Sequence, residues 1–294
     1  MDAVHGPIVV GVDGSENAVL AVRWAAAEAT VRGTPLHIVH ATGLDTRAGL
    51  RLDSAHQLML DAGQDILDDA VAQAVSQVPG PEVAATLSQD SAVSALLGEA
   101  GENGMIVVGS RGLGGFSALL LGSVGLRTAT RAAVPLVVVR GESDAVPKGV
   151  VLVAVRDERD LDAVRFAAEA ADRRKASLRV LSAYTFYEYA GSMVPMLDDL
   201  TGVAEEQASA TSRLLAPLRD EFPGVTVTVD VVRAQSVAGA LVDASEQADL
   251  LVVGTRRPAH VIGVSLGHVA HAVLHHAHCP VVMLPLGERR ATDG

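Results

Sequence analysis

Residues 105–111 read Met-Ile-Val-Val-Gly-Ser-Arg, and residues 250–256 read Leu-Leu-Val-Val-Gly-Thr-Arg. Each stretch is an apolar run that ends in glycine, which is typical of a strand buried on both faces of a parallel sheet. The two runs are 145 positions apart, and Gly122 and Gly267 keep the same spacing (267 − 122 = 145). A repeat of this length indicates two copies of one domain, because solenoid repeats are far shorter.

The rest of the chain of 294 residues fits this division into two domains. A polar segment at 141–148 joins the copies, and we predict one domain over residues 1–142 and a second over residues 148–288. In both, apolar runs alternate with helical patterns, which predicts an α/β fold with a five-stranded, mainly parallel sheet and helices on both faces. In the first domain we expect strands at residues 8–12, 36–41, 83–87, 105–108 and 136–140.

Composition excludes several classes of function. The formal net charge is −12 and aromatic residues make up 3% of the chain, which disfavours a nucleic-acid partner. The two lysines, Lys148 and Lys175, do not stand in a Gly-Lys-Ser/Thr context, so a P-loop nucleoside triphosphatase is excluded. The single cysteine, Cys279, and the lack of a leader or a long apolar run predict a cytoplasmic protein without a membrane partner.

The loop after the 105–108 strand carries the most informative motif. It reads Gly109-Ser110-Arg111-Gly112, then nine residues, then Gly122-Ser123 at the start of an expected helix. Ligands of parallel sheets bind beyond the carboxyl ends of the strands, and helix N-termini favour anions. The motif is consistent with a phosphate cradle, although glycines that merely turn the chain would give the same spacing.

This motif resembles the ATP-binding motif of the universal stress protein family. Residues 9–15 (Val-Val-Gly-Val-Asp-Gly-Ser), 22–25, 39–41 and 134–139 are also similar to that family, so the resemblance covers nearly the whole chain as two tandem domains of the actinobacterial type. It implies a Rossmann-like fold of the adenine nucleotide alpha hydrolase type and a homodimer. It also implies ATP, with or without Mg²⁺, as the ligand, and a nucleotide-dependent role in the stress response.

The resemblance also implies which residues bind the nucleotide. Asp13 matches an acid that contacts the ribose, although the same residue could instead cap the following helix. Ala41 matches the end of the strand whose backbone contacts adenine, and the glycine loop matches the phosphate-binding positions. The implied site comprises Gly11, Val12, Asp13, Ala41, Val108, Gly109, Ser110, Arg111, Gly112, Leu113, Gly114, Gly122, Ser123 and Val124.

The second copy departs from the motif. An arginine replaces Asp13, another arginine replaces Gly112, and a histidine replaces Ser123. We therefore predict a degenerate second site with weak or absent ATP binding, although its loop arginines could bind phosphate in another way. The corresponding positions are Arg156, Gly254, Arg256, Arg257, Gly267 and His268.

An enzyme is the alternative to a regulator. An ATPase or a nucleotide-transfer enzyme needs a positioned base and metal ligands, and the first copy offers no carboxylate beyond Asp13, so no catalytic residue is assigned. His268, His271 and His275 share one face of an expected helix, which could bind a metal ion or simply be polar; we assign no metal. Asp13→Ala and Gly109→Val are expected to weaken nucleotide binding without unfolding the protein.

Overall fold

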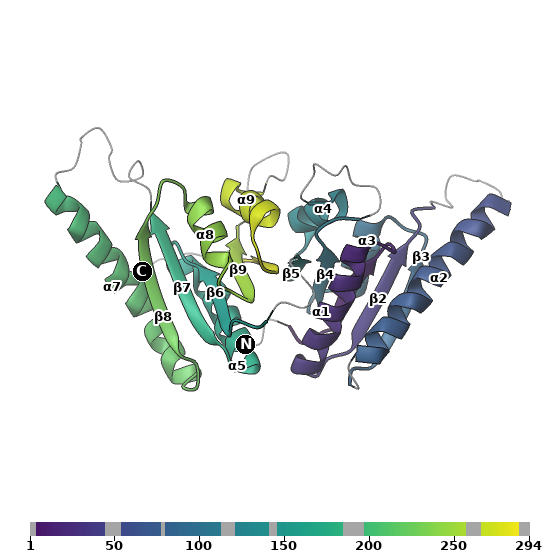
Figure 1. Cartoon of the computed structure of the whole chain (residues 1–294), viewed down its shortest axis with the longest axis horizontal. Helices are drawn as coiled ribbons and strands as arrows, with labels where there is room; N and C mark the ends of the chain where they lie inside the picture. Colours follow the sequence, from purple (N-terminus) through teal and green to yellow (C-terminus); the bar gives the residue numbers. More distant parts are fainter. Residues whose placement is uncertain are drawn as a thin grey trace. The chain divides into compact units, whose positions relative to one another are not determined.

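The computed structural model describes residues 4–44, 54–77, 80–112, 121–140, 146–184, 197–256 and 266–287. The chain divides into two compact units, Met1–Ser143 and Asp144–Gly294, which we call unit 1 and unit 2. In each unit a parallel sheet lies between two layers of helices (Figure 1). The predicted fold class is confirmed.

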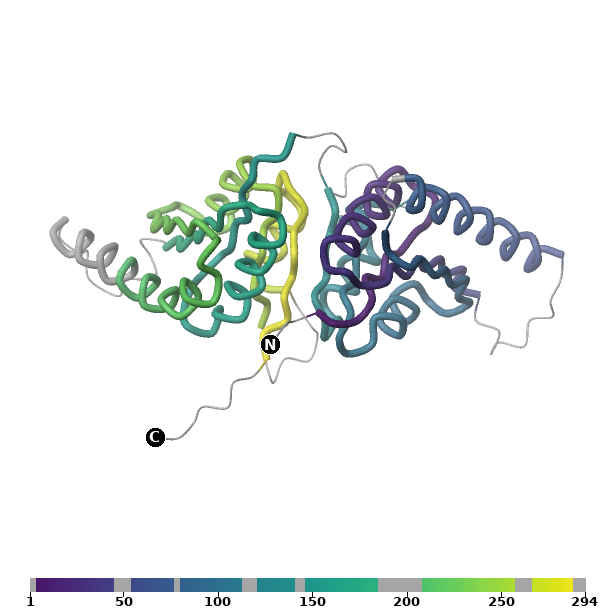
Figure 2. Tube along the Cα trace, turned by 90° about the horizontal axis from the view of Figure 1, so that it is seen from below, coloured from purple at the N-terminus to yellow at the C-terminus, as the bar shows by residue number. Residues whose placement is uncertain are grey.

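The sheet of unit 1 has the strand order β3-β2-β1-β4-β5, and neighbouring strands are parallel. Because the connection from β3 to β4 crosses over β1 and β2, α1 and α2 cover one face while α3 and α4 cover the other (Figure 2). The order reverses between β1 and β4, where such sheets bind ligands. The strands are β1 (Ile8–Val12), β2 (Leu36–Ala41), β3 (Val83–Ser88), β4 (Met105–Gly109) and β5 (Leu136–Val139), and the helices are α1 (Glu16–Arg32), α2 (Ser54–Gln77), α3 (Ala92–Ala100) and α4 (Ser123–Arg131).

Unit 2 repeats this topology with the strand order β8-β7-β6-β9-β10. A short 3₁₀ turn precedes its first α-helix, whereas α1 of unit 1 starts directly. None of the helices in the described ranges is long and apolar enough to cross a membrane. The elements are β6 (Val150–Ala154), η2 (Glu158–Asp160), α5 (Leu161–Arg174), β7 (Ser177–Tyr184), α7 (Leu197–Glu221), β8 (Val227–Arg233), α8 (Val237–Ser245), β9 (Leu250–Thr255), α9 (His268–His276) and β10 (Val281–Pro285).

The core of each unit lies on both faces of the central strands. Ile8, Val9 and Val10 of β1 are completely buried, which explains why this strand reads as a continuous apolar run rather than an alternating one. The helix that follows presents a stripe of alanines to the sheet, including Ala21 and Ala25, so its backbone packs closely. At the edge, β3 has no fully buried residue.

The first helix of each unit ends in a left-handed residue, which is Gly33 (φ 66°) after α1 but Lys175 (φ 54°) after α5. This conformation costs a residue with a Cβ about 1 kcal/mol. Lys175→Gly is therefore expected to raise the free energy of unfolding of unit 2 by about 0.5–1 kcal/mol, since the exposed ion pair of Lys175 with Asp172 contributes little. Denaturant titration of the full chain measures this gain. Gly33→Lys should lower the stability of unit 1, and a loss of stability in Lys175→Gly would contradict the argument.

Candidate functional site

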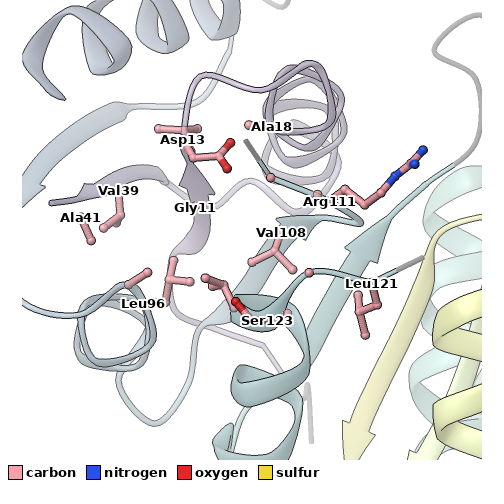
Figure 3. A pocket seen from close by; sticks show the side chains of 17 residues that line it. Gly11, Asp13, Ala18, Val39, Ala41, Leu96, Val108, Arg111, Leu121 and Ser123 are labelled. Carbon is pink, nitrogen blue, oxygen red and sulfur yellow. The ribbon is translucent and has the colours of Figure 1, made fainter. Parts of the chain in front are cut away.

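Unit 1 contains a cleft of about 480 Å³ at the carboxyl ends of β1 and β4 (Figure 3). Its walls come from the ends of β1, β2 and β4, from α3, and from the starts of α1 and α4. The cleft therefore lies where the strand order reverses, as expected for an open α/β sheet. This volume is in the usual range for sites that bind small molecules.

Asp13 lies at the rim of this cleft, directly after β1. Its Oδ1 accepts a hydrogen bond from the backbone N–H of Ser15 (3.1 Å). Ser15 is the residue that caps α1, because its Oγ accepts from the N–H of Ala18 (3.2 Å). The alternative reading of Asp13 as the helix cap is thus wrong. A Cβ at Gly112 would collide with Oδ2 of Asp13, so the glycine leaves room for the carboxylate.

The glycine loop after β4 is fastened to the start of α1. Gly109 packs against α1 so closely that a Cβ would lie 2.6 Å from the carbonyl oxygen of Asn17. The hydroxyl of Ser110 donates to Oδ1 of Asn17 (3.3 Å), and the carbonyl of Ser110 accepts from the N–H of Gly122 (2.8 Å). Ser110 is buried and does not line the cleft, so this residue of the expected site joins the two ends of the loop instead.

The amino end of α4 forms the opposite wall. Gly122 is its N-cap and makes no side-chain capping bond, while Ser123, Val124 and Gly125 of the first turn line the cleft. The N–H groups of a first helical turn have no partners within the helix, and they carry the positive end of the helix dipole. Figure 3 shows Asp13 and Ser123 on opposite sides of the cleft. The cleft therefore has a carboxylate on one side and the positive end of a helix dipole on the other.

An apolar wall completes the cleft beside α3. Leu96 packs over Gly11, where a Cβ would lie 3.2 Å from its Cδ2. The apolar residues of this wall were not expected from the sequence, because apolar side chains at helical or strand spacing are usually core residues. The cleft-lining residues that were not expected are Ala18, Val39, Ala92, Leu96, Leu121 and Gly125.

Most of the expected residues do come together in the cleft. Arg111 lines it with an exposed side chain, and its guanidinium extends away from Asp13 (Figure 3). Leu113 and Gly114 lie outside the residues that the structure describes. The expected residues that line the cleft are Gly11, Val12, Asp13, Ala41, Val108, Gly109, Arg111, Gly112, Gly122, Ser123 and Val124.

Comparison with known proteins identifies the family. The model of the universal stress protein family matches residues 5–140 and 149–285, once for each unit. The chain belongs to the universal stress protein family. The universal stress protein Rv2623 of Mycobacterium tuberculosis is 33% identical to it over 287 residues, which cover 94% of this chain and 95% of that protein.

Two further relatives extend the comparison. The universal stress protein Mb2028c of Mycobacterium bovis is 30% identical over 289 residues, covering 95% of this chain and 96% of the relative. The crystal structure of a universal stress protein from Archaeoglobus fulgidus matches with a TM-score of 0.68 at 16% identity and covers 98% of this chain and 99% of that one. This structural likeness supports the fold.

The corresponding region of the second universal stress protein domain holds a cluster of ion pairs. Arg156, which stands in place of Asp13, binds Oδ1 of Asp160 (3.2 Å) and the carbonyl of Gly254 (3.4 Å). Arg256 donates to Asp157 (2.7 Å) and to Asp160 (3.1 Å). Side chains of the domain itself thus lie beside Gly254.

Asp157 belongs to the same cluster and caps η2. Its hydrogen bond with the Arg159 guanidinium (2.8 Å), aided by Arg256, holds the pKa of this carboxyl well below its usual range, and the same bond raises the pKa of Arg159. The carboxylate is therefore charged throughout the neutral range.

Two of the remaining positions of the second site lie at the start of α9. Gly267 is its N-cap and His268 its first residue, both exposed, while Arg257 lies outside the described residues. The rings of His271 and His275 stack with centroids 4.4 Å apart. Within the described ranges, no group of three His, Cys, Asp or Glu side chains is arranged to hold a metal ion.

Proposed function

We propose that the protein is a stress-response regulator that binds ATP in the cleft of unit 1. The observation that carries this proposal is the convergence of Asp13, the glycine loop and the amino end of α4 on one cleft. A carboxylate accepts hydrogen bonds from ribose hydroxyls, and a helix N-terminus binds phosphate oxygens. The apolar wall of Val39 and Leu96 provides a surface for the base.

The phosphates would be held without a lysine. Gly112 and Gly122 expose backbone close to the cleft, and the first-turn N–H groups of α4 supply hydrogen-bond donors. Arg111 lines the cleft from the same loop and would supply a positive charge for the phosphates. Asp13 is the one carboxylate among the described residues that line the cleft, so it is also the candidate ligand for a Mg²⁺ ion bound with the nucleotide.

Slow ATP hydrolysis is the second candidate function, and the side chains around the cleft favour it less. A hydrolytic site needs a base beside the attacking water. The Nδ1 of His40, near the end of β2, lies 2.8 Å from the carbonyl oxygen of Val12. Its ring packs against Gly63 of α2, on the face of β2 opposite to the cleft. We therefore favour a regulator over a hydrolase. In a regulator, ATP binding would act by favouring one conformation or assembly of the protein over another.

Location and assembly complete the proposal. Cys279 is buried and makes no disulfide, which is compatible with the reducing cytoplasm. A homodimer is the assembly that we expect, and light scattering with and without ATP measures whether the nucleotide changes it.

Asp13→Asn is expected to weaken ATP binding by roughly 10- to 100-fold, because a charge-assisted hydrogen bond contributes about 1.5–3 kcal/mol. Asparagine retains an oxygen that can accept from Ser15, so the fold should persist. Isothermal titration calorimetry of the full chain measures the change. Asp61→Asn on the exposed face of α2 removes the same charge and should bind as the wild type does. Unchanged affinity in Asp13→Asn would reject the assignment of the site.

A further inference from the structure

Besides the three changes in the motif, the two domains differ at a position in the first turn after the first strand. Ser15 caps α1 and Asp157 caps η2, so these residues are equivalent. The third residue after each cap is Ala18 in unit 1 and Asp160 in unit 2. Ala18 lines the cleft of unit 1 with a side chain that ends at Cβ. Asp160 places a carboxylate at the corresponding point of unit 2.

The carboxylate of Asp160 is almost completely buried, with 1% of the residue exposed. Its Oδ2 accepts from the backbone N–H of Arg156 (2.8 Å), and its Oδ1 accepts from the guanidinium groups of Arg156 (3.2 Å) and Arg256 (3.1 Å). Oδ1 also lies 3.1 Å from where a Cβ of Gly254 would be. Two arginines and a backbone amide around an anion beside a strand-ending glycine form the kind of donor set that binds a phosphate group.

Unit 1 has the complementary arrangement. Its strand-ending glycine, Gly109, lines the cleft together with Ala18, and no acidic side chain stands at position 18. In the direction of a Cβ, Gly109 meets the backbone of Asn17, whereas Gly254 meets Leu286 and Asp160. Arg111, the counterpart of Arg256, forms no ion pair within the part of the chain that the structure describes, and its side chain is exposed. The equivalent arginines therefore differ. Arg256 binds the buried carboxylate of Asp160, whereas the side chain of Arg111 is exposed where no such carboxylate is present.

We propose that Asp160 is a built-in anion that takes, in unit 2, the place which Ala18 leaves open in unit 1 for a phosphate group of the ligand. The part of the inference that concerns Ala18 rests on the proposed nucleotide site of unit 1. The part that concerns anion binding at the position of Asp160 involves unit 2 alone. Asp160 would then be the physical reason for the weak or absent nucleotide binding that we predict for the second domain, because the donors beside Gly254 are already satisfied.

Asp160→Ala tests the anion-binding half with inorganic phosphate as the probe. The variant should unfold at a lower temperature than the wild type, and 20 mM phosphate (about the concentration needed for a millimolar site) should recover part of the loss. Sodium chloride at equal ionic strength should recover less. The shift in unfolding temperature that phosphate causes in the wild type is subtracted from the shift in the variant. The double variant Asp160→Ala with Arg256→Gln should show no recovery by phosphate. Equal recovery by phosphate and chloride would overturn the proposal.

Ala18→Asp tests the other half and does not depend on the folding of the Asp160 variant. The new carboxylate should lower the ATP affinity of the full chain at least tenfold. Ala27→Asp, on the exposed side of α1, adds the same charge and should leave the affinity unchanged. Wild-type affinity in Ala18→Asp would overturn the proposal. Absence of ATP binding by the wild type would instead reject the proposed function, and the phosphate test on Asp160→Ala would still decide whether Asp160 replaces an anion.

Discussion

Gly109→Ala is expected to lower the free energy of unfolding of unit 1 by about 3 kcal/mol, which is the upper part of the usual range for overpacking. The added Cβ would lie 2.6 Å from the carbonyl oxygen of Asn17 and 2.7 Å from its carbonyl carbon. Both atoms belong to the backbone of α1, so the helix itself must move. Denaturant titration of the full chain measures the loss.

The matched control is Gly254→Ala in unit 2. There the added Cβ would meet side-chain atoms, Leu286 Cδ1 at 2.8 Å and Asp160 Oδ1 at 3.1 Å, and Leu286 can rotate away. We expect a smaller loss, and equal losses in the two variants would contradict the argument. The same geometry contradicts the expectation that Gly109→Val weakens binding without unfolding, because the glycine is needed for packing. Asp13→Asn is the cleaner test of binding.

Asp249→Ala is expected to destabilise unit 2 by about 2 kcal/mol, because the carboxylate accepts hydrogen bonds from three consecutive backbone amides and is partly exposed to water. Its Oδ1 binds the N–H of Lys148 (2.8 Å), and its Oδ2 binds those of Gly149 (2.6 Å) and Val150 (3.1 Å). These bonds fasten the segment that enters β6 to the start of β9. Thermal unfolding followed by circular dichroism measures the loss.

Lys148→Ala provides the comparison for this clamp. It removes only a long bond from Nζ to the carbonyl of Ala248 (3.5 Å) and keeps the backbone amide that binds Asp249. We expect a loss of less than about 0.5 kcal/mol, in the range of exposed polar side chains. If Asp249→Ala were no more destabilising than Lys148→Ala, the three amide bonds would not contribute as proposed.

The fold was predictable because its signals are local and repeated. Continuous apolar runs such as residues 8–10 predict strands covered on both faces, and the repeat doubles the number of observations. The beginning of α1 was less certain, since both Asp13 and Ser15 are good capping residues. The hydrogen bond from the N–H of Ala18 to Ser15 Oγ identifies Ser15 as the cap, and the helix begins at Glu16.

The site was predictable where it depends on unusual residues and not where it depends on common ones. Glycines and an acid after a buried strand are rare enough to mark a cleft, whereas Leu96 looks like any core residue of a helix. The cluster in unit 2 could not be read from sequence, because Arg256 and Asp160 are 96 positions apart. Sequence patterns indicated that the second copy had changed, but only the contacts show that Asp160 is held between Arg156 and Arg256.

The number of ATP molecules bound to one chain tests the central claim most directly. Native mass spectrometry of the full chain with added ATP should show one nucleotide per chain, and Asp13→Asn at the same ATP concentration should show far less. Two nucleotides per chain would contradict the inequality of the domains. One nucleotide that Asp13→Asn retains at full occupancy would place the site elsewhere, and none would reject ATP as the ligand.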